Sequence, residues 1–277
     1  MKPQTLILSA TLTLLTACGG SGGDGSGGDN NVTLVPPDFS NYKGAMRRTS
    51  TGEMMPEAYD KRMEYVQTLG VNYRQGSLKP STIIYNGKTL LNFGDSRLNI
   101  DFRSLPRGYL AATAEENNSN GRVPTRIRSY QGYYSGAYLQ RPIGDGTDFN
   151  FTYGVYPLRE DLPQSGTARY TGAAFDINDR GTLTYNIDFG KKEGAGSISG
   201  LSRFGDITLH TATLRPIDDG DFATYEITRG RATVERGFGH NYELKLYGPQ
   251  AAELAGNLRE DFDNDVVAAF YGSRTDR

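Results

Sequence analysis

The two histidines have the widest chemistry in this chain, because imidazole acts as a general base, a metal ligand and an axial ligand of haem. His210 and His240 each stand alone in a strand-like segment, with no cysteine nearby and no second histidine at helical spacing. A zinc site needs three or four convergent ligands, so the sequence predicts no metal site. We interpret both histidines as structural. Haem held by one histidine or by a tyrosine stays open as an alternative, and no other cofactor is expected.

Two acidic clusters, residues 218–221 and 261–265, bring carboxylates together. The second cluster resembles the start of a calcium-binding loop. It has Val266 where that loop needs Gly, and Gly272 where it needs Glu. We interpret both clusters as solvated hairpin turns. The chain also lacks a G-x-S-x-G motif and any nucleophile linked to a histidine, so we expect a binding protein and not an enzyme.

The single cysteine, Cys18, is interpreted from the residues before it. A short positive start is followed by an apolar stretch over residues 5–15. This stretch is shorter than the roughly 20 residues that a membrane-spanning helix needs, and it fits a secretory signal. The signal ends in Leu-Thr-Ala-Cys at residues 15–18, which resembles the lipobox of bacterial lipoproteins. That resemblance implies cleavage after residue 17 and lipidation of Cys18.

A Gly-rich segment follows the cysteine and forms the predicted tether, residues 18–41 including the anchor. Gly, Ser and Asp in residues 19–31 bury no apolar surface, so the segment behaves as a random coil with a reach of roughly 20 Å. Residues 23–28 match G-x-G-x-x-G, but no strand precedes them and no helix follows. A dinucleotide-binding interpretation therefore fails.

The rest of the chain is predicted to be β-rich, in keeping with 18 Tyr, 12 Phe and no Trp. One short helix is expected over residues 56–69, with Pro56 at its start and Gly70 at its end. Residues 115–121 are polar and aperiodic, which predicts a loop that could contact a partner. The strands expected in the first half are residues 89–93, 98–102, 126–130, 136–140 and 148–155.

The second half alternates more regularly, as in residues 182–189, where Leu183, Tyr185, Ile187 and Phe189 share one face. About eight such strands predict a closed antiparallel barrel whose interior side chains fill, with room at most for one small ligand. The predicted strands are residues 167–175, 182–189, 194–199, 205–215, 223–235, 240–247, 253–259 and 265–272.

Three segments of this second half resemble one superfamily, that of transferrin-binding protein B and factor H binding protein. They are residues 162–175 (Leu-Pro-Gln-Ser-Gly-Thr-Ala-Arg-Tyr-Thr-Gly-Ala-Ala-Phe), residues 181–198, and residues 247–257 (Tyr-Gly-Pro-Gln-Ala-Ala-Glu-Leu-Ala-Gly-Asn) followed by 267–272. Their order and spacing hold across residues 162–277. The resemblance implies an all-β fold with an N-terminal β-rich handle domain containing one short helix, residues 42–161, and a C-terminal eight-stranded antiparallel β-barrel, residues 162–277.

The resemblance also implies a cellular location and a function. It implies a lipoprotein exposed on the outer membrane, carried there by a surface lipoprotein assembly modulator (Slam) translocator, and held to the membrane through its lipid anchor alone. It implies binding of a host-derived protein, namely a complement regulator, a haem or iron carrier, or a colonisation receptor. The chain is about half the length of transferrin-binding protein B, which makes transferrin the less favoured ligand. The net charge of −2 gives no reason to expect nucleic acid, and we expect a monomer.

No ligand contact of the superfamily can be matched onto the first half. Aromatic and Arg side chains dominate protein interfaces, so the candidate partner-binding residues are Arg128, Tyr130, Tyr133, Tyr134 and Tyr138. The competing interpretation places these tyrosines in core and cross-strand pairs. The alternative function is a lipoprotein that binds a small ligand in the barrel or in the crevice between the halves.

Overall fold

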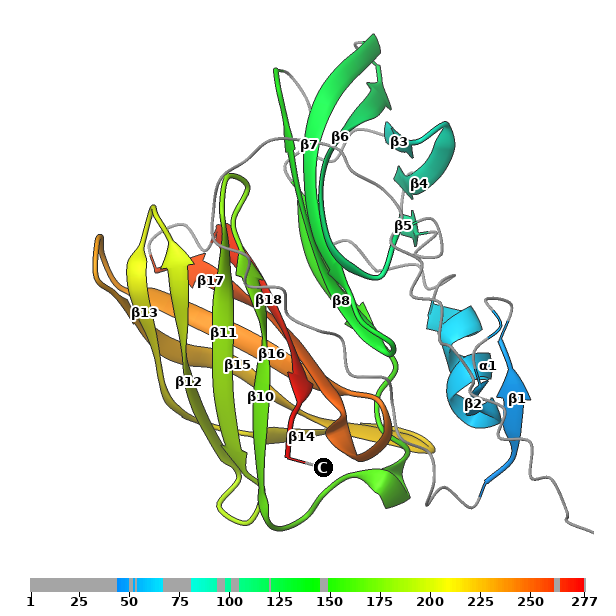
Figure 1. Ribbon diagram of the computed structural model, residues 1–277, viewed down its shortest axis with the longest axis vertical. Helices are drawn as coiled ribbons and strands as arrows, with labels where there is room; N and C mark the ends of the chain where they lie inside the picture. The colour runs from blue at the N-terminus through cyan, green and yellow to red at the C-terminus, as the bar shows by residue number, and fades with distance from the viewer. Residues whose placement is uncertain are drawn as a thin grey trace, which may run out of the picture. The chain divides into compact units, whose positions relative to one another are not determined.

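The computed structural model describes residues 44–49, 52, 54–66, 81–93, 98–100, 105–119, 121–144, 149–261 and 265–276 (Figure 1). The signal sequence, Cys18 and the tether lie outside the described residues. Residues 31–277 form one compact unit that contains both β-sheets. The chain between the two sheets, residues 155–166, includes the predicted domain boundary after residue 161.

The described chain begins with a small hairpin and the one α-helix described. Strand β1 (Met46–Arg48) pairs antiparallel with β2 (Met54–Pro56), and α1 (Glu57–Val66) follows at once. Pro56 immediately precedes the helix, where its fixed φ suits a helix start. The helix is confirmed, and the predicted residues 67–69 lie outside the described part.

The handle is a seven-stranded antiparallel sheet in the order β5-β4-β3-β6-β7-β8-β9. Its strands are β3 (Ser81–Tyr85), β4 (Lys88–Phe93), β5 (Leu98–Ile100), β6 (Gly108–Asn118), β7 (Gly121–Gln131), β8 (Ser135–Pro142) and β9 (Phe149–Gly154). One face of the sheet packs around a core that includes Ile83, Leu91, Ile127 and Tyr138.

The second half is an eight-stranded antiparallel barrel, as the sequence predicts. The ring runs β13-β12-β11-β10-β18-β17-β16-β15 and closes through pairing of β13 with β15, while β14 pairs with the start of β15. The strands are β10 (Thr167–Phe175), β11 (Arg180–Asp188), β12 (Glu193–Leu201), β13 (Gly205–Thr213), β14 (Arg215–Asp219), β15 (Phe222–Val234), β16 (His240–Tyr247), β17 (Glu253–Glu260) and β18 (Val266–Arg274). The eight predicted strands agree with these bounds within two residues.

Side chains fill the barrel interior. Leu183, Tyr185 and Ile187 of β11 point inward, as the alternation predicts, and are at most 1% exposed. The Tyr185 and Tyr242 hydroxyls meet across the interior at 2.9 Å, and Tyr242 donates to the His210 carbonyl at 2.7 Å. Burial raises the pKa of both phenols, that of Tyr242 to about 12. The interior is therefore a packed core in which the Tyr185 and Tyr242 hydroxyls are paired, which leaves little volume for a ligand.

Several strands depart from the sequence-based expectations. Residues 115–118 belong to the end of β6, so the predicted polar loop is wrong; the chain turns tightly after Asn118 and β7 begins at Gly121. Glu116 is fully buried there, which the polar composition of the segment does not reveal. Strands β1, β2, β3, β6 and β14 were not predicted. Strands β1 and β2 have three residues each and β3 and β14 five, while the end of β6 lies where the polar loop was expected.

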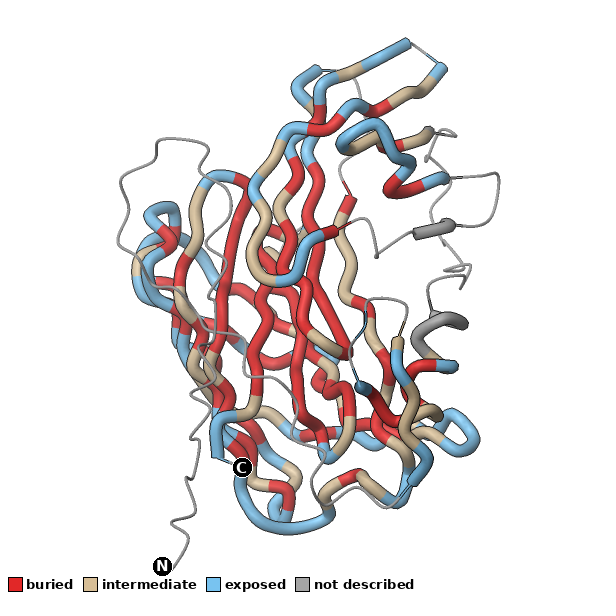
Figure 2. Tube along the Cα trace, turned by 45° about the vertical axis from the view of Figure 1, so that its right-hand side comes forward, coloured by how far each residue is buried: buried red, intermediate tan, exposed pale blue. Residues whose placement is uncertain are grey.

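Strands β17 and β18 lose the alternation that the other barrel strands keep. Residues 253–258 and 267–273 are buried without interruption, whereas β11 and β13 alternate between buried and exposed positions (Figure 2). A strand buried at every position has both faces covered. The barrel interior covers one face, and the handle covers the other.

Candidate functional site

The junction between handle and barrel is centred on a buried carboxylate, Glu253, at the start of β17. Its Oε1 accepts a hydrogen bond from the backbone N–H of Tyr133 at 2.8 Å. Its Oε2 accepts from the N–H groups of Tyr134 at 3.0 Å and Ser135 at 2.9 Å, and from the Ser135 hydroxyl at 2.8 Å. One side chain of the barrel therefore satisfies three consecutive N–H groups in the turn between β7 and β8.

Burial raises the pKa of Glu253, and the hydrogen bonds from Tyr133, Ser135 and Tyr134 oppose that rise. Gly132 lies against the same carboxylate. A Cβ atom at Gly132 would come within 2.5 Å of Glu253 Oε2 and of the Tyr271 hydroxyl, so only glycine fits. The close approach of the turn to the barrel thus depends on the absence of a side chain at residue 132.

Apolar contacts surround this polar centre. Tyr130 stacks on Tyr271 of the barrel with ring centroids 4.4 Å apart, and Tyr109 packs against Phe175 at 5.7 Å. The cluster that joins the two sheets contains Tyr130, Ala137, Leu139, Ala173, Phe175, Ala269 and Tyr271. Small alanines on the barrel side let the sheets approach closely, and the aromatic rings fill the space between them.

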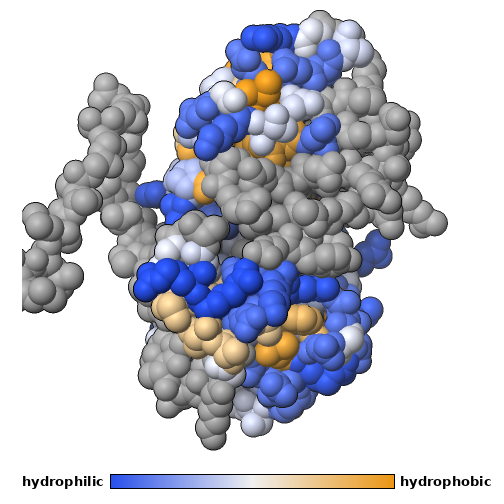
Figure 3. Space-filling view, turned by 90° about the vertical axis from the view of Figure 1, so that its right-hand side faces the viewer, coloured by the Kyte–Doolittle hydropathy of each residue, from blue (hydrophilic) through white to orange (hydrophobic). Residues whose placement is uncertain are grey.

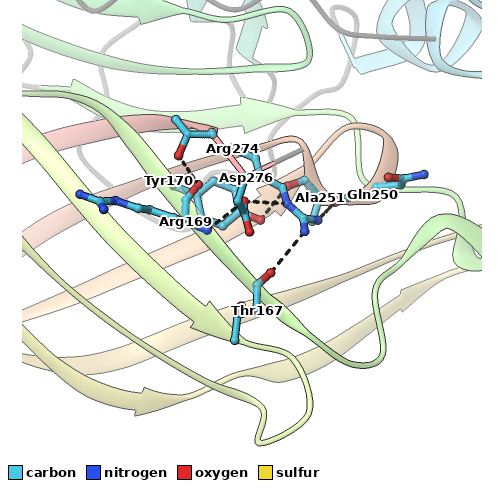
Figure 4. A network of polar contacts seen from close by, with 8 residues as sticks. Thr167, Arg169, Tyr170, Gln250, Ala251, Arg274 and Asp276 are labelled. Carbon is cyan, nitrogen blue, oxygen red and sulfur yellow. Dashed lines mark hydrogen bonds and ion pairs between the residues drawn. The ribbon is translucent and has the colours of Figure 1, made fainter. Parts of the chain in front are cut away.

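The connection between β16 and β17, residues 248–252, positions Glu253. Gly248, Gln250 and Ala251 all have positive φ, of 72°, 53° and 55°. For Gln250 and Ala251 this conformation is strained, and persists only when neighbouring contacts hold it. Arg274 donates to the Gln250 carbonyl at 3.2 Å, and the Tyr170 hydroxyl donates to the Ala251 carbonyl at 2.7 Å (Figure 4).

The same network fastens the end of the chain. Arg274 Nε bonds Asp276 at 3.1 Å, and Asp276 accepts from the Arg169 backbone N–H at 3.0 Å (Figure 4). Arg274 also donates to the Thr167 carbonyl at 3.3 Å. The network therefore joins the start of β10, the end of β18 and the strained connection that leads into Glu253.

The N-terminal helix is tied to the same junction by Tyr59. This side chain is fully buried; its hydroxyl accepts from the Leu158 N–H at 2.8 Å and donates to Asp161 at 2.8 Å. Its ring meets Tyr134 edge to face at 5.7 Å. The surrounding cluster draws on all three parts of the chain and contains Met55, Tyr59, Tyr134, Val155, Tyr247, Ala252 and Ala255.

The structure separates the five candidate partner-binding residues. Tyr130 and Tyr134 lie in the junction and Tyr138 lies in the handle core, where each is at most 2% exposed. The expectation that they form part of an exposed patch is therefore wrong, because both faces of this segment are covered. Arg128 is half-buried on the handle sheet, and Tyr133 is half-buried with Arg107 stacked 4.1 Å above its ring. Contact of these two with a partner stays a prediction.

The other groups with potential chemistry take structural positions. His210 is exposed and bonds Thr233 at 2.7 Å, while His240 is buried and donates from Nδ1 to the Phe238 carbonyl at 2.7 Å. The first acidic cluster is a hairpin turn, as predicted, in which Arg159 holds Asp218 and lowers the pKa of its carboxyl. Residues 262–264 of the second cluster lie outside the described part. Among the described residues, no group of three or more His, Cys, Asp or Glu is arranged to hold a metal ion.

Two open hollows lie at the end of the barrel formed by the turns after β12, β15 and β17. The larger, of about 600 Å³, has a charged lining that includes Arg229, Glu243, Arg259 and Asp261. The smaller, of about 180 Å³, lies between Phe204 and Phe238, and Phe238 is 78% exposed. An exposed phenylalanine beside charged groups is compatible with contact to a partner, but these hollows are shallow surface features.

Figure 3 shows the molecule from the right-hand side of Figure 1. The described residues on this side are largely hydrophilic, with smaller hydrophobic areas between them. Met54, in β2, is 49% exposed. Within the described ranges, no helix has the length and apolar content to cross a membrane.

Comparison with known families supports the resemblance inferred from the sequence. Residues 160–258 match the family model described as factor H binding protein, C-terminal. The matched segment runs from the linker before β10 into β17 and includes Glu253 and the strained connection before it. The resemblance to factor H binding protein is confirmed over residues 160–258. The motif at residues 247–257 includes Glu253, which gives the motif a structural role in the junction.

Solved structures with a similar fold include transferrin-binding protein B from Haemophilus parasuis Hp5, as a Tyr-to-Ala and Trp-to-Ala double mutant. That match has 16% identity and a TM-score of 0.46, and covers 74% of this chain and 46% of that one. The protein from serogroup B Neisseria meningitidis gives 15% identity and a TM-score of 0.43, covering 72% and 44%. This chain therefore spans about half the length of these relatives.

Proposed function

We propose that this chain is a lipid-anchored protein of the outer-membrane surface and that it binds a host-derived protein. Its residues 160–258 match the factor H binding protein C-terminal family. The family match is the observation that carries the proposal. The proposed ligand is a complement regulator, a haem or iron carrier, or a colonisation receptor. Export by a Slam-type translocator and a monomeric state belong to the same proposal.

The architecture supports binding through the outer surface. The barrel interior is packed with aromatic and aliphatic side chains, and the space between the sheets is filled by Glu253 and the apolar cluster around it. Binding of a small ligand in either place would require these side chains to move. The alternative of a small-ligand-binding lipoprotein is therefore less well supported than recognition of a protein at exposed strands and turns.

The first experiment is protease treatment of intact cells that express either the wild type or Cys18→Ala. Surface display predicts that protease removes the wild-type protein from intact cells, while the Cys18→Ala form is found in the periplasm or medium. The purified chain is then used to capture proteins from host serum. Protection of the wild-type protein until the cells are lysed would place it in the periplasm and remove the basis for host-protein binding.

We propose no bound cofactor, and a separate experiment tests whether the protein binds haem. Titration of haemin into the purified protein should give no saturable Soret shift. A saturable shift that Tyr133→Phe or His240→Ala abolishes would instead favour the haem-carrier alternative.

A further inference from the structure

One face of the handle carries a row of arginines. In β7, the residues that point into the handle core are Thr125 and Ile127, so Arg122, Arg126 and Arg128 share the opposite face. Arg141 of β8 is directly opposite Arg126 in the strand register, and side chains of such pairs lie on the same face. Arg122, Arg126 and Arg141 are exposed and Arg128 is half-buried.

Among the described residues of this face in β6, β7 and β8, arginines outnumber acids. Among the described residues of β6, β7 and β8, Glu115 is the one acid that shares the face, and it lies 3.6 Å from Arg122. Glu116, its neighbour in β6, is buried on the other side. Arg126 forms no ion pair with a described residue, and Nε of Arg128 is buried without a hydrogen-bond partner.

The row extends to the barrel. Residues 122–128 span roughly 20 Å along the strand at about 3.3 Å per residue. At the barrel end, Arg180 lies 5.1 Å above the ring of half-buried Tyr109. Burial raises the pKa of that phenol; the nearby Arg128 and Arg180 oppose the rise, and the nearby Asp176 and Asp179 add to it. Between the arginines, the face presents the small and neutral side chains of Ala111 and Thr113. Arg and Tyr, which this face presents, are among the residue types enriched at protein interfaces.

We propose that this face of β6–β8 is the surface on which the handle binds its partner, and that the partner presents a cluster of Asp and Glu carboxylates. Planar guanidinium groups bind carboxylates through paired hydrogen bonds. The exposed Arg122, Arg126 and Arg141 can present such groups to a partner, while half-buried Arg128 donates from Nη1 to the Ile127 carbonyl at 2.8 Å. This inference deepens the proposed function, because it assigns the surface and the partner's chemistry.

The test compares two double charge reversals that change the net charge equally. Arg126→Glu with Arg141→Glu alters the centre of the face, and Arg215→Glu with Arg231→Glu alters exposed positions of β14 and β15 on the barrel. The probe is a fluorescein-labelled poly-L-glutamate peptide, measured by anisotropy at low and at physiological ionic strength. The handle reversal should weaken binding at least about tenfold and flatten its salt dependence, while the barrel reversal leaves both nearly unchanged. Arg126→Gln with Arg141→Gln should fall between, and circular dichroism verifies folding of each variant.

Four results decide the inference. Equal loss from the handle and barrel reversals, or no loss from either, overturns it. Tighter binding of heparin than of poly-L-glutamate at matched charge would assign the face to a sulfated polysaccharide and overturn the partner class. If the wild type captures a host protein and the handle reversal captures it equally well, the proposed function stands and this surface does not. If the peptide results hold but no host protein is captured, the surface stands and the proposed function fails.

Discussion

Replacement of Glu253 should destabilise the protein by an amount that depends on which of its oxygens is lost. Glu253→Ala leaves three backbone N–H groups and the Ser135 hydroxyl without their acceptor inside the junction. A buried polar group without a partner costs about 1–3 kcal/mol, and these losses are not additive because water enters the space. We expect a total on the order of 3–5 kcal/mol in the free energy of unfolding.

Glu253→Gln is the matched control. Placed with its carbonyl oxygen where Oε2 lies, it keeps the bonds from Tyr134 and Ser135. Its amide then faces the Tyr133 N–H, so one acceptor is lost and two donors oppose each other. The cost should be about 1–2 kcal/mol, because one hydrogen bond is lost and not four.

The measurement is urea-induced unfolding of the otherwise full chain carrying Cys18→Ser, followed by far-UV circular dichroism. Because Glu253 joins the handle to the barrel, a second effect is expected in Glu253→Ala. The unfolding transition should broaden or separate into two transitions as the two sheets lose their coupling. Limited proteolysis should then release the barrel while it is still folded. If the Ala and Gln variants lose equal stability, and each loses less than about 1 kcal/mol, the hydrogen bonds to Glu253 do not hold the junction together.

Three further predictions concern buried positions. Burial raises the pKa of Glu253, so the contribution of this group to the free energy of unfolding is fully present below its unfolded pKa near 4.5 and declines as pH rises through its folded pKa. The stability advantage of the wild type over Glu253→Gln should therefore shrink above pH 4.5, and an advantage that grows with pH would contradict this. Gly132→Ala should lower the melting temperature well beyond a neutral surface substitution such as Ser165→Ala, since its Cβ would lie 2.5 Å from two buried side chains; calorimetry of the two variants tests this. Tyr185→Phe should cost about 1 kcal/mol, because it removes the hydroxyl that pairs with Tyr242 inside the barrel, and unchanged urea unfolding would show that this pair contributes nothing.

Sequence-based prediction worked best where one face of a strand is buried and the other is exposed to solvent. The barrel strands β11, β15 and β16 show much of this alternation, and their positions were predicted within two residues. Burial on both faces removes the signal. Tyr130, Tyr134 and Tyr138 were candidates for a partner because nothing local shows that the handle and the barrel enclose them. A continuous run such as Val-Ala-Ala-Phe-Tyr-Gly in β18 is the signal that could have located this second interface.

Glu253 was missed for a related reason. An acidic residue at the start of an apolar strand resembles an ordinary solvated strand end, and its partners are 118–120 residues away in the chain. The family resemblance located the motif around it without stating what the glutamate does. Long-range pairing of backbone groups with a single carboxylate has no local sequence pattern.

The unequal pairing around the barrel has a consequence for how the barrel opens. Strands β13 and β15 close it through three residue pairs, Ile207 with Val234, Thr208 with Thr233 and Leu209 with Ala232, whereas β16 and β17 share eight pairs. Backbone amides at the short seam should exchange with deuterium earliest among the interior strands, and those of β17 and β18 last, because the handle shields them. Thermal motion would then part the ring at this seam while the handle junction stays intact.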